Sequence, residues 1–257
     1  MHTYREAFTH MANNIARIWE TDPEAKPKER KFSDDYVGRF RSGRLVGKQP
    51  EALNEWRVTT GDPSVAGKIS SLLGGEAAEW ETDKEDNIEV LTTSKSVEVI
   101  IDSSAAVDAS MKKFGFTGLE HHCDGVVYLS DDDPKLVGER CGCPALLQDR
   151  RDRAKSGKGP KPSVDLTFKL AAAPELGKFR FNSGSWELVK VLHTIIEDID
   201  TAGGADEDGK GGAPVRALLS IERVEYTTKA GRDVAYNKPA VKVTGVYEAA
   251  QPLADAA

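Results

Sequence analysis

All three cysteines of the 257-residue chain lie between positions 123 and 143, and this clustering constrains the fold more than any other feature. Cys123 follows two adjacent histidines, and a single glycine separates Cys141 from Cys143. An odd number of cysteines in one short segment is a poor framework for disulfides and a typical one for a metal site. The cysteine usage therefore favours a reducing, cytoplasmic compartment.

Side chains two residues apart on an extended backbone point to the same side. His121 and Cys123 would then converge from one arm, and Cys141 and Cys143 from the other, if residues 126–137 form a hairpin. Three thiolates and one imidazole make a closed tetrahedral zinc site. The metal would hold together a hairpin that is too small to bury a core of its own. We therefore predict a structural zinc ion on these four residues.

Three alternatives to this zinc site stay open. His122 replaces His121 as the ligand if the backbone is irregular there, or the cysteines are reduced core side chains with both histidines at the surface. A catalytic zinc would need an open position and a nearby base. Asp124 could be that base, although Asp followed by Gly is more simply a turn. No nucleotide-binding loop, zinc-protease motif or nucleophile elbow occurs, so we expect that the chain is not an enzyme.

The hydrophobic pattern predicts an α+β fold. Asp62 can cap a helix that ends at Gly74, and Ser185 can cap a second helix over 186–200. Alternating apolar residues predict strands, for example over 164–170 and 215–221. The spacing of Val107, Met111 and Phe114 predicts another short helix over 107–114.

We expect two small, mainly antiparallel β units, each with one main helix, plus the zinc-bound β-hairpin. Similar strand-to-helix junctions at 56–62 and 179–185 suggest that the units are related. The predicted order along the chain is a flexible N-terminal arm (1–31), an N-terminal α+β unit (32–118), the zinc-binding hairpin (119–145), a basic linker (146–162), a C-terminal α+β unit (163–247) and a flexible tail (248–257).

The charge balance restricts the class of partner. Thirty-five Lys and Arg residues stand against 42 Asp and Glu residues, a net charge of −7. This argues against a protein that grips nucleic acid by general phosphate neutralisation. The basic segment 150–161 has no interleaved aromatic residues for stacking bases, so it supports nucleic-acid binding only weakly. No apolar run is long enough to span a bilayer, and the first twenty residues contain no signal-like segment, so we expect a cytoplasmic protein.

Several short motifs between Ile18 and Val243 together resemble actinophage recombination directionality factors, the partners of large serine integrases in Streptomyces temperate phages. The motifs are Asp22-Pro-Glu-Ala-Lys-Pro-Lys28, Val37-Gly-Arg-Phe40, Glu55-Trp-Arg-Val-Thr-Thr-Gly-Asp-Pro63, Cys123-Asp-Gly125, Cys141-Gly-Cys143-Pro144, Ser183-Gly-Ser-Trp186 and Lys238-Pro-Ala-Val-Lys242. They are structural rather than catalytic, so they are more specific for the family than for an activity.

The resemblance implies a regulator that works in the cytoplasm of a bacterial host. Such a factor binds the integrase through its coiled-coil region and recognises no specific DNA sequence alone. It inhibits recombination of attP with attB and activates attL with attR, so that the prophage excises. The alternative is a phage DNA-replication accessory that binds single-stranded DNA through sheet aromatics and the segment 150–161.

Overall fold

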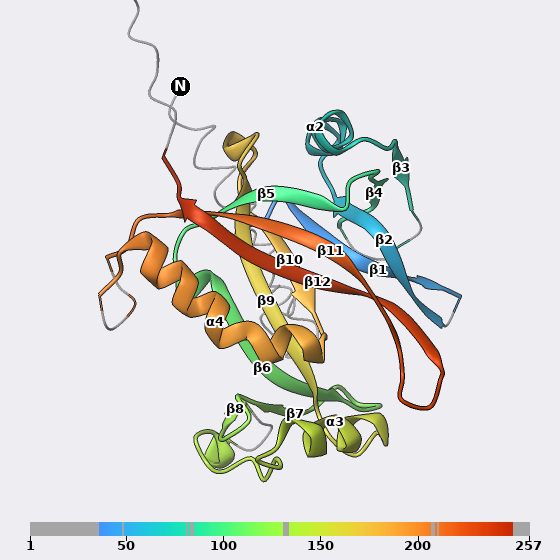
Figure 1. The fold of residues 1–257 in the computed structure, drawn as a ribbon, viewed down its shortest axis with the longest axis vertical. Helices are drawn as coiled ribbons and strands as arrows, with labels where there is room; N and C mark the ends of the chain where they lie inside the picture. The colour runs from blue at the N-terminus through green and yellow to red at the C-terminus, as the bar shows by residue number, and fades with distance from the viewer. Residues whose placement is uncertain are drawn as a thin grey trace, which may run out of the picture. The chain divides into compact units, whose positions relative to one another are not determined.

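The computed structural model describes residues 36–47, 49–80, 82, 85–130, 134–206, 209 and 211–248 (Figure 1). The expected N-terminal arm, residues 131–133 and nearly all of the expected tail lie outside the described residues. The fold is mixed α+β, as predicted, and consists mostly of strands with three α-helices in the described part.

In the described residues, twelve strands pair into one network. The main path runs β12-β11-β5-β9-β10-β1-β2-β4-β3, while β6 pairs with β9 and β7, and β7 pairs with β8. The strands are β1 (Gly38–Val46), β2 (Gln49–Thr60), β3 (Ala77–Glu79), β4 (Ile88–Leu91), β5 (Ser96–Ile101), β6 (Val107–Phe114), β7 (Leu119–Cys123), β8 (Tyr128–Ser130), β9 (Lys161–Leu170), β10 (Phe179–Ser183), β11 (Val215–Thr227) and β12 (Asp233–Val246).

Two helices start at the caps that the sequence predicts. Asp62 Oδ1 accepts a hydrogen bond from Ser64 N at 2.7 Å at the start of α2 (Pro63–Leu73). Ser185 Oγ accepts from Leu188 N at the start of α4 (Trp186–Gly203), which lies along one face of the sheet (Figure 1). Short 3₁₀ turns occupy Ser104–Ala106, Pro134–Leu136 and Pro174–Leu176. None of the described helices is long and apolar enough to cross a bilayer.

The expected two-unit arrangement is not confirmed. β1 pairs in parallel with β10, and β5 lies between β9 and β11, so strands from both halves of the chain alternate in the sheet. The two similar junctions do exist as strand-to-helix connections, β2 into α2 and β10 into α4. Pairing between strands that are far apart in sequence therefore joins the two predicted α+β units into one sheet.

The predicted short helix over 107–114 is wrong, because this segment forms β6. Three apolar residues at helical spacing are too few to exclude a strand. Pairing of β6 with β9 on one side and β7 on the other decides the outcome. A helix also occurs where none was predicted. The expected basic linker 146–162 contains the helix α3 (Leu147–Lys155).

The two faces of the central strands differ strongly. One face contributes buried aromatic rings to the core, including Phe40, Trp56 and Phe181, with edge-to-face contacts at centroid distances of 5.3–5.8 Å. Residues one step along the same strands face the other way, so Arg39 and Arg180 lie side by side across the β1–β10 pair. The central sheet therefore has an aromatic face in the core and a cationic face opposite.

Candidate metal centre

The structure brings together the four residues that the sequence predicts as zinc ligands. His121 and Cys123 come from β7, and Cys141 and Cys143 come from the segment that precedes α3. One nitrogen or sulfur atom from each residue lies within 4.8 Å of the others. Cys123 and Cys141 are buried, whereas His121 and Cys143 are half-buried.

Two distances inside this cluster match the edges of a tetrahedral site. With Zn–S bonds of about 2.3 Å and Zn–N bonds of about 2.0–2.1 Å, two sulfurs lie about 3.8 Å apart and a sulfur and a nitrogen about 3.5 Å apart. Cys123 Sγ lies 3.8 Å from Cys143 Sγ, and His121 Nε2 lies 3.5 Å from Cys143 Sγ. His121 Nε2 is closer to Cys123 Sγ, at 3.1 Å. The donor atoms therefore fit a zinc-sized ion.

The two adjacent histidines point to opposite sides of β7. His121 faces the thiols, and its ring packs on that of Tyr128 with centroids 4.8 Å apart. His122 instead forms a hydrogen bond of 2.7 Å to Ser130 Oγ on β8. Of the two histidines, the structure brings only His121 to the cysteines. β7 pairs with β6 without a shift from His121 to Cys123, so neighbouring side chains alternate there, although its pairing with β8 shifts between His122 and Cys123.

The connection between the two arms differs from the predicted hairpin. β7 turns directly into β8, and Asp124 Oδ1 accepts hydrogen bonds from Val126 N and Val127 N within this turn. These two hydrogen bonds lower the pKa of Asp124, and the bond from Val127 has the larger effect. Asp124 thus stabilises a turn, as the simpler interpretation of Asp-Gly predicts.

The second arm returns along the β8 side of the site. Cys141 N donates to Val126 O at 2.9 Å, and Tyr128 N donates to Glu139 O at 2.9 Å. At the end of the predicted hairpin, residue 137 forms only an isolated parallel bridge, between Tyr128 and Val137. The predicted hairpin is therefore not confirmed, although the two arms do meet at the expected residues.

Arg150 of α3 joins both arms of the cluster. Its guanidinium donates to Gly125 O at 2.9 Å, two residues after Cys123, and to Pro144 O, one residue after Cys143. Gly125 has φ +97°, and an added Cβ would lie 2.4 Å from the guanidinium. A glycine is therefore needed where Arg150 closes over the turn. Sequence analysis missed this role because nothing in a basic segment indicates which arginine turns inward.

The surroundings of the cluster are apolar. Met111 on β6, Tyr128 and Trp186, the first residue of α4, pack around the buried cysteines. Burial raises the pKa of the Cys123 thiol and also that of the Cys143 thiol. A divalent cation would reverse this preference, since zinc binds thiolates and displaces their protons. The set of donors is chemically suited to a closed structural ion.

A family model described as Gp3-like, recombination directionality factor-like, matches residues 37–242. The match includes the whole of the metal centre and most of the sheet. The chain belongs to this Gp3-like family. Proteins of a recombination directionality factor-like family are typically non-catalytic regulators that partner a recombinase. No solved structure matches the chain.

Proposed function

We propose that this Gp3-like protein is a phage recombination directionality factor that binds a large serine integrase. It inhibits recombination between attP and attB and activates recombination between attL and attR, which excises the prophage. The observation that carries the proposal is the family match over residues 37–242. The resemblance in the sequence motifs supports the serine class of integrase.

We also propose that His121, Cys123, Cys141 and Cys143 bind one structural zinc ion. Two donor distances close to tetrahedral edges, the burial of Cys123 and Cys141, and the hydrogen bonds from Arg150 to both arms support this assignment. All four positions of the ion would be filled by protein, which leaves none for a substrate. The ion would therefore stabilise the segment 119–145 rather than catalyse a reaction.

A regulator of this kind acts by unequal binding. It can redirect the integrase only if it binds one arrangement of the integrase more tightly than the other. A change from mostly one outcome to mostly the other takes about 5.5 kcal/mol of such preference, or less if several copies act together. A few aromatic or arginine anchors in one interface can supply it.

At least two of the six cations in the segment 150–161 contact the protein itself, which weakens the replication-accessory alternative. Arg150 binds the turns of the metal centre, and Arg151 lies 3.5 Å from Glu187 on α4. These side chains stabilise the protein itself and are not free to follow a phosphate backbone. We therefore propose the directionality function alone.

The test is recombination in vitro with purified integrase from the same phage. Adding the protein should activate attL with attR and inhibit attP with attB. If neither reaction changes across a titration, the proposed function is wrong. A parallel gel-shift measurement should give a shift of attachment-site DNA only when integrase is present. Binding of single strands by the protein alone, with strong salt dependence, would support the accessory function instead.

A further inference from the structure

The cationic face of the sheet contains a hollow where neighbouring strands diverge. β1 follows β10 only as far as Phe40, and its pairing with β2 shifts between Arg41 and Gly43. β6 continues past its last pairing with β9 at Lys112 and ends at Phe114. The space between them is a hollow of about 420 Å³, bounded by β1, β6, β9 and β10.

Four cations line this hollow: Arg39, Arg41, Lys112 and Arg180. Two have carboxylate partners, since Arg41 lies 2.9 Å from Asp86 and Arg180 lies 2.7 Å from Asp165. Asp108, exposed on β6 opposite Asp165, is a third nearby carboxylate.

Arg39 and Lys112 make no ion pair with any residue in the described part of the chain. They are half-buried side chains on opposite walls of the hollow. The hollow thus holds two cations outside ion-pair distance of any described carboxylate, although Arg39 still attracts Asp86 and Lys112 attracts Asp165.

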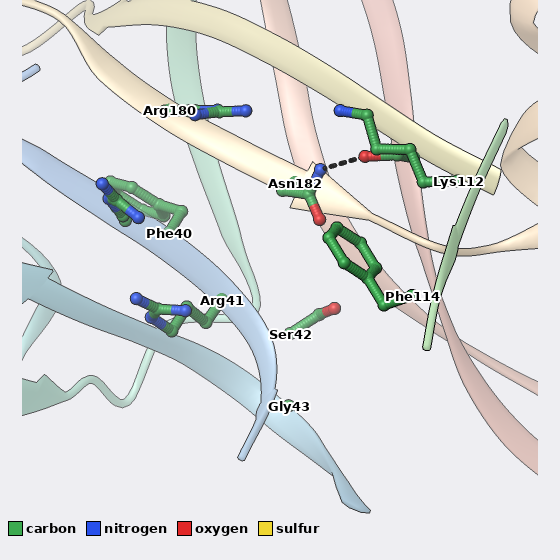
Figure 2. Close-up of a pocket in the computed structure, with 10 residues that line it drawn as sticks. Phe40, Arg41, Ser42, Gly43, Lys112, Phe114, Arg180 and Asn182 are labelled. Carbon is green, nitrogen blue, oxygen red and sulfur yellow. Dashed lines mark hydrogen bonds between the residues drawn. The ribbon is translucent and has the colours of Figure 1, made fainter. Parts of the chain in front are cut away.

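The wall between these cations offers an acceptor and an apolar surface. The Asn182 amide nitrogen donates both to Ser163 Oγ at 3.0 Å and to Asp165 Oδ1 at 2.9 Å. Its carbonyl oxygen consequently points the other way, toward the ring of Phe114 (Figure 2). A ligand here would meet cations, one hydrogen-bond acceptor and an aromatic side chain.

Exposed apolar side chains flank the hollow at two hairpin tips. The tip between β6 and β7 carries Phe114, 70% exposed, and the fully exposed Phe116. The tip between β1 and β2 carries Leu45 and Val46, 72% and 55% exposed. Arg41 and Gly43 line both the hollow and the adjoining depression below Leu45, so the two surfaces are continuous. Apolar side chains at this exposure, beside arginines, are typical of a protein-docking surface.

We propose that this hollow is the docking site for an acidic segment of the recombinase, with its carboxylates on Arg39 and Lys112 and a neighbouring apolar residue against Phe114. Asn182 Oδ1 would accept a hydrogen bond from a backbone N–H of that segment. The inference rests on the proposed function and assigns the surface through which it acts.

A nucleic acid fits this surface less well than an acidic peptide. Binding along a strand depends on neutralising several phosphates, and two unpaired cations are few for that purpose. Leu45 and Val46 cannot stack bases as aromatic side chains do. The net charge of −7 also repels a polyanion at long range, whereas it favours approach to a basic partner that bears a local acidic segment.

The experiment measures binding of the full chain to purified integrase from the same phage by biolayer interferometry. The test variant is Arg39→Gln with Lys112→Gln. The matched control, Arg223→Gln with Lys229→Gln, removes the same charge from exposed positions on the β11–β12 ribbon. We expect binding to weaken about tenfold or more in the test variant only, with a shallower salt dependence. Phe114→Ala should also weaken binding, whereas Lys113→Ala, on the opposite face of β6, should not.

The outcomes separate this inference from the function on which it rests. If wild type and the test variant bind integrase equally, the docking site is wrong while the proposed function stands. If the wild-type chain fails to bind integrase, both are wrong. A fluorescent single-stranded oligonucleotide is the second probe. If wild type binds it and the test variant does not, the hollow is a nucleic-acid site and the proposal is overturned. Thermal unfolding of each variant shows whether the fold is intact.

Discussion

The central sheet and the segment around the metal centre bury very different amounts of apolar surface. The sheet buries Phe40, Trp56, Phe168 and Phe181 together, and α2 and α4 add Ile69 and Ile199. Around the metal centre, the buried cluster in the described residues is Met111, Cys123 and Cys141, with Tyr128, Cys143 and Trp186 partly buried against it. Each fully buried large side chain contributes about 1.5–3 kcal/mol. The sheet can therefore hold its shape by apolar packing, whereas the small cluster around Cys123 and Cys141 buries too little apolar surface for that, and the proposed zinc ion would have to stabilise it.

The largest expected effect tests whether the metal centre depends on its ligands. Cys123→Ser should abolish binding of one zinc equivalent, because it removes one of the four proposed ligands. The effect should be large, since apparent zinc-binding free energies for intact sites of this kind are on the order of 10 kcal/mol. Hydrogen exchange should increase over 119–145 and remain slow in the core strands. Elemental analysis and exchange mass spectrometry measure the two effects. His122→Ala is the control. This variant should retain the metal, because His122 faces Ser130 and not the cysteines.

Absence of zinc from wild-type protein purified without chelator would refute the assignment. Unchanged exchange over 119–145 in the Cys123 variant would show that this segment folds without the ion. Either result would show that the two regions do not differ in their dependence on a metal ion.

The converse experiment disturbs the sheet. Phe40→Ala removes a ring that contacts Trp56, Phe168 and Phe179, and it should lower the free energy of unfolding by about 3–5 kcal/mol. Urea denaturation measures the loss. Phe114→Ala, at an exposed phenylalanine, should change stability by less than about 0.5 kcal/mol. Equal losses in the two variants would contradict the position of the core.

Arg150 sharpens the comparison at the metal centre. Arg150→Ala removes the hydrogen bonds to Gly125 O and Pro144 O, and it should weaken zinc binding about 10–100-fold while leaving all four ligands in place. Competition with a chromophoric chelator measures the affinity. Lys155→Ala on the same helix serves as the control, because Lys155 is exposed and makes only a 3.9 Å ion pair with Asp152. Identical affinities for the two variants would exclude a positioning role for Arg150.

The smallest expected effect concerns pH and the cationic face of the sheet. Burial alone would raise the pKa of Asp165, but hydrogen bonds from Arg180 and Asn182 outweigh it and lower the pKa below its ordinary value of 3.8. A carboxylate with a lowered folded-state pKa stabilises the fold above pH 3.8, and this contribution is lost as the pH falls through the folded-state value. Asp165→Asn should therefore cost on the order of 1 kcal/mol at neutral pH, and the difference from wild type should shrink in acid.

Denaturation of both proteins at a series of pH values measures this difference. Comparing variant with wild type at each pH cancels the acid sensitivity of the metal ligands, which both proteins share. A difference that stays constant into acid would show that the Asp165–Arg180 pair does not contribute in this way.

Local chemistry in the sequence determined the two main helices and the four residues proposed as metal ligands. Asp62 and Ser185 provide caps that act within three residues, so α2 and α4 start where the sequence predicts. The ligand set is similarly local, because alternation along a strand puts His121 and Cys123 on one side. Clustering of all the cysteines then indicated the partner residues, although the sequence left His121 and His122 as alternatives.

Long-range pairing decided the rest, because its partners are far apart in sequence and leave no local signal. β6 is a strand only because β7 and β9 flank it, and α3 has a structural role only because Arg150 reaches two turns from outside its own segment. The cationic hollow combines side chains from β1, β6 and β10, up to 143 positions apart between Arg39 and Asn182. The alternation of arginine and phenylalanine in both β1 and β10 was a signal for two-faced strands. It could not show that the two strands pair in parallel, and that pairing is what places Arg39 beside Arg180.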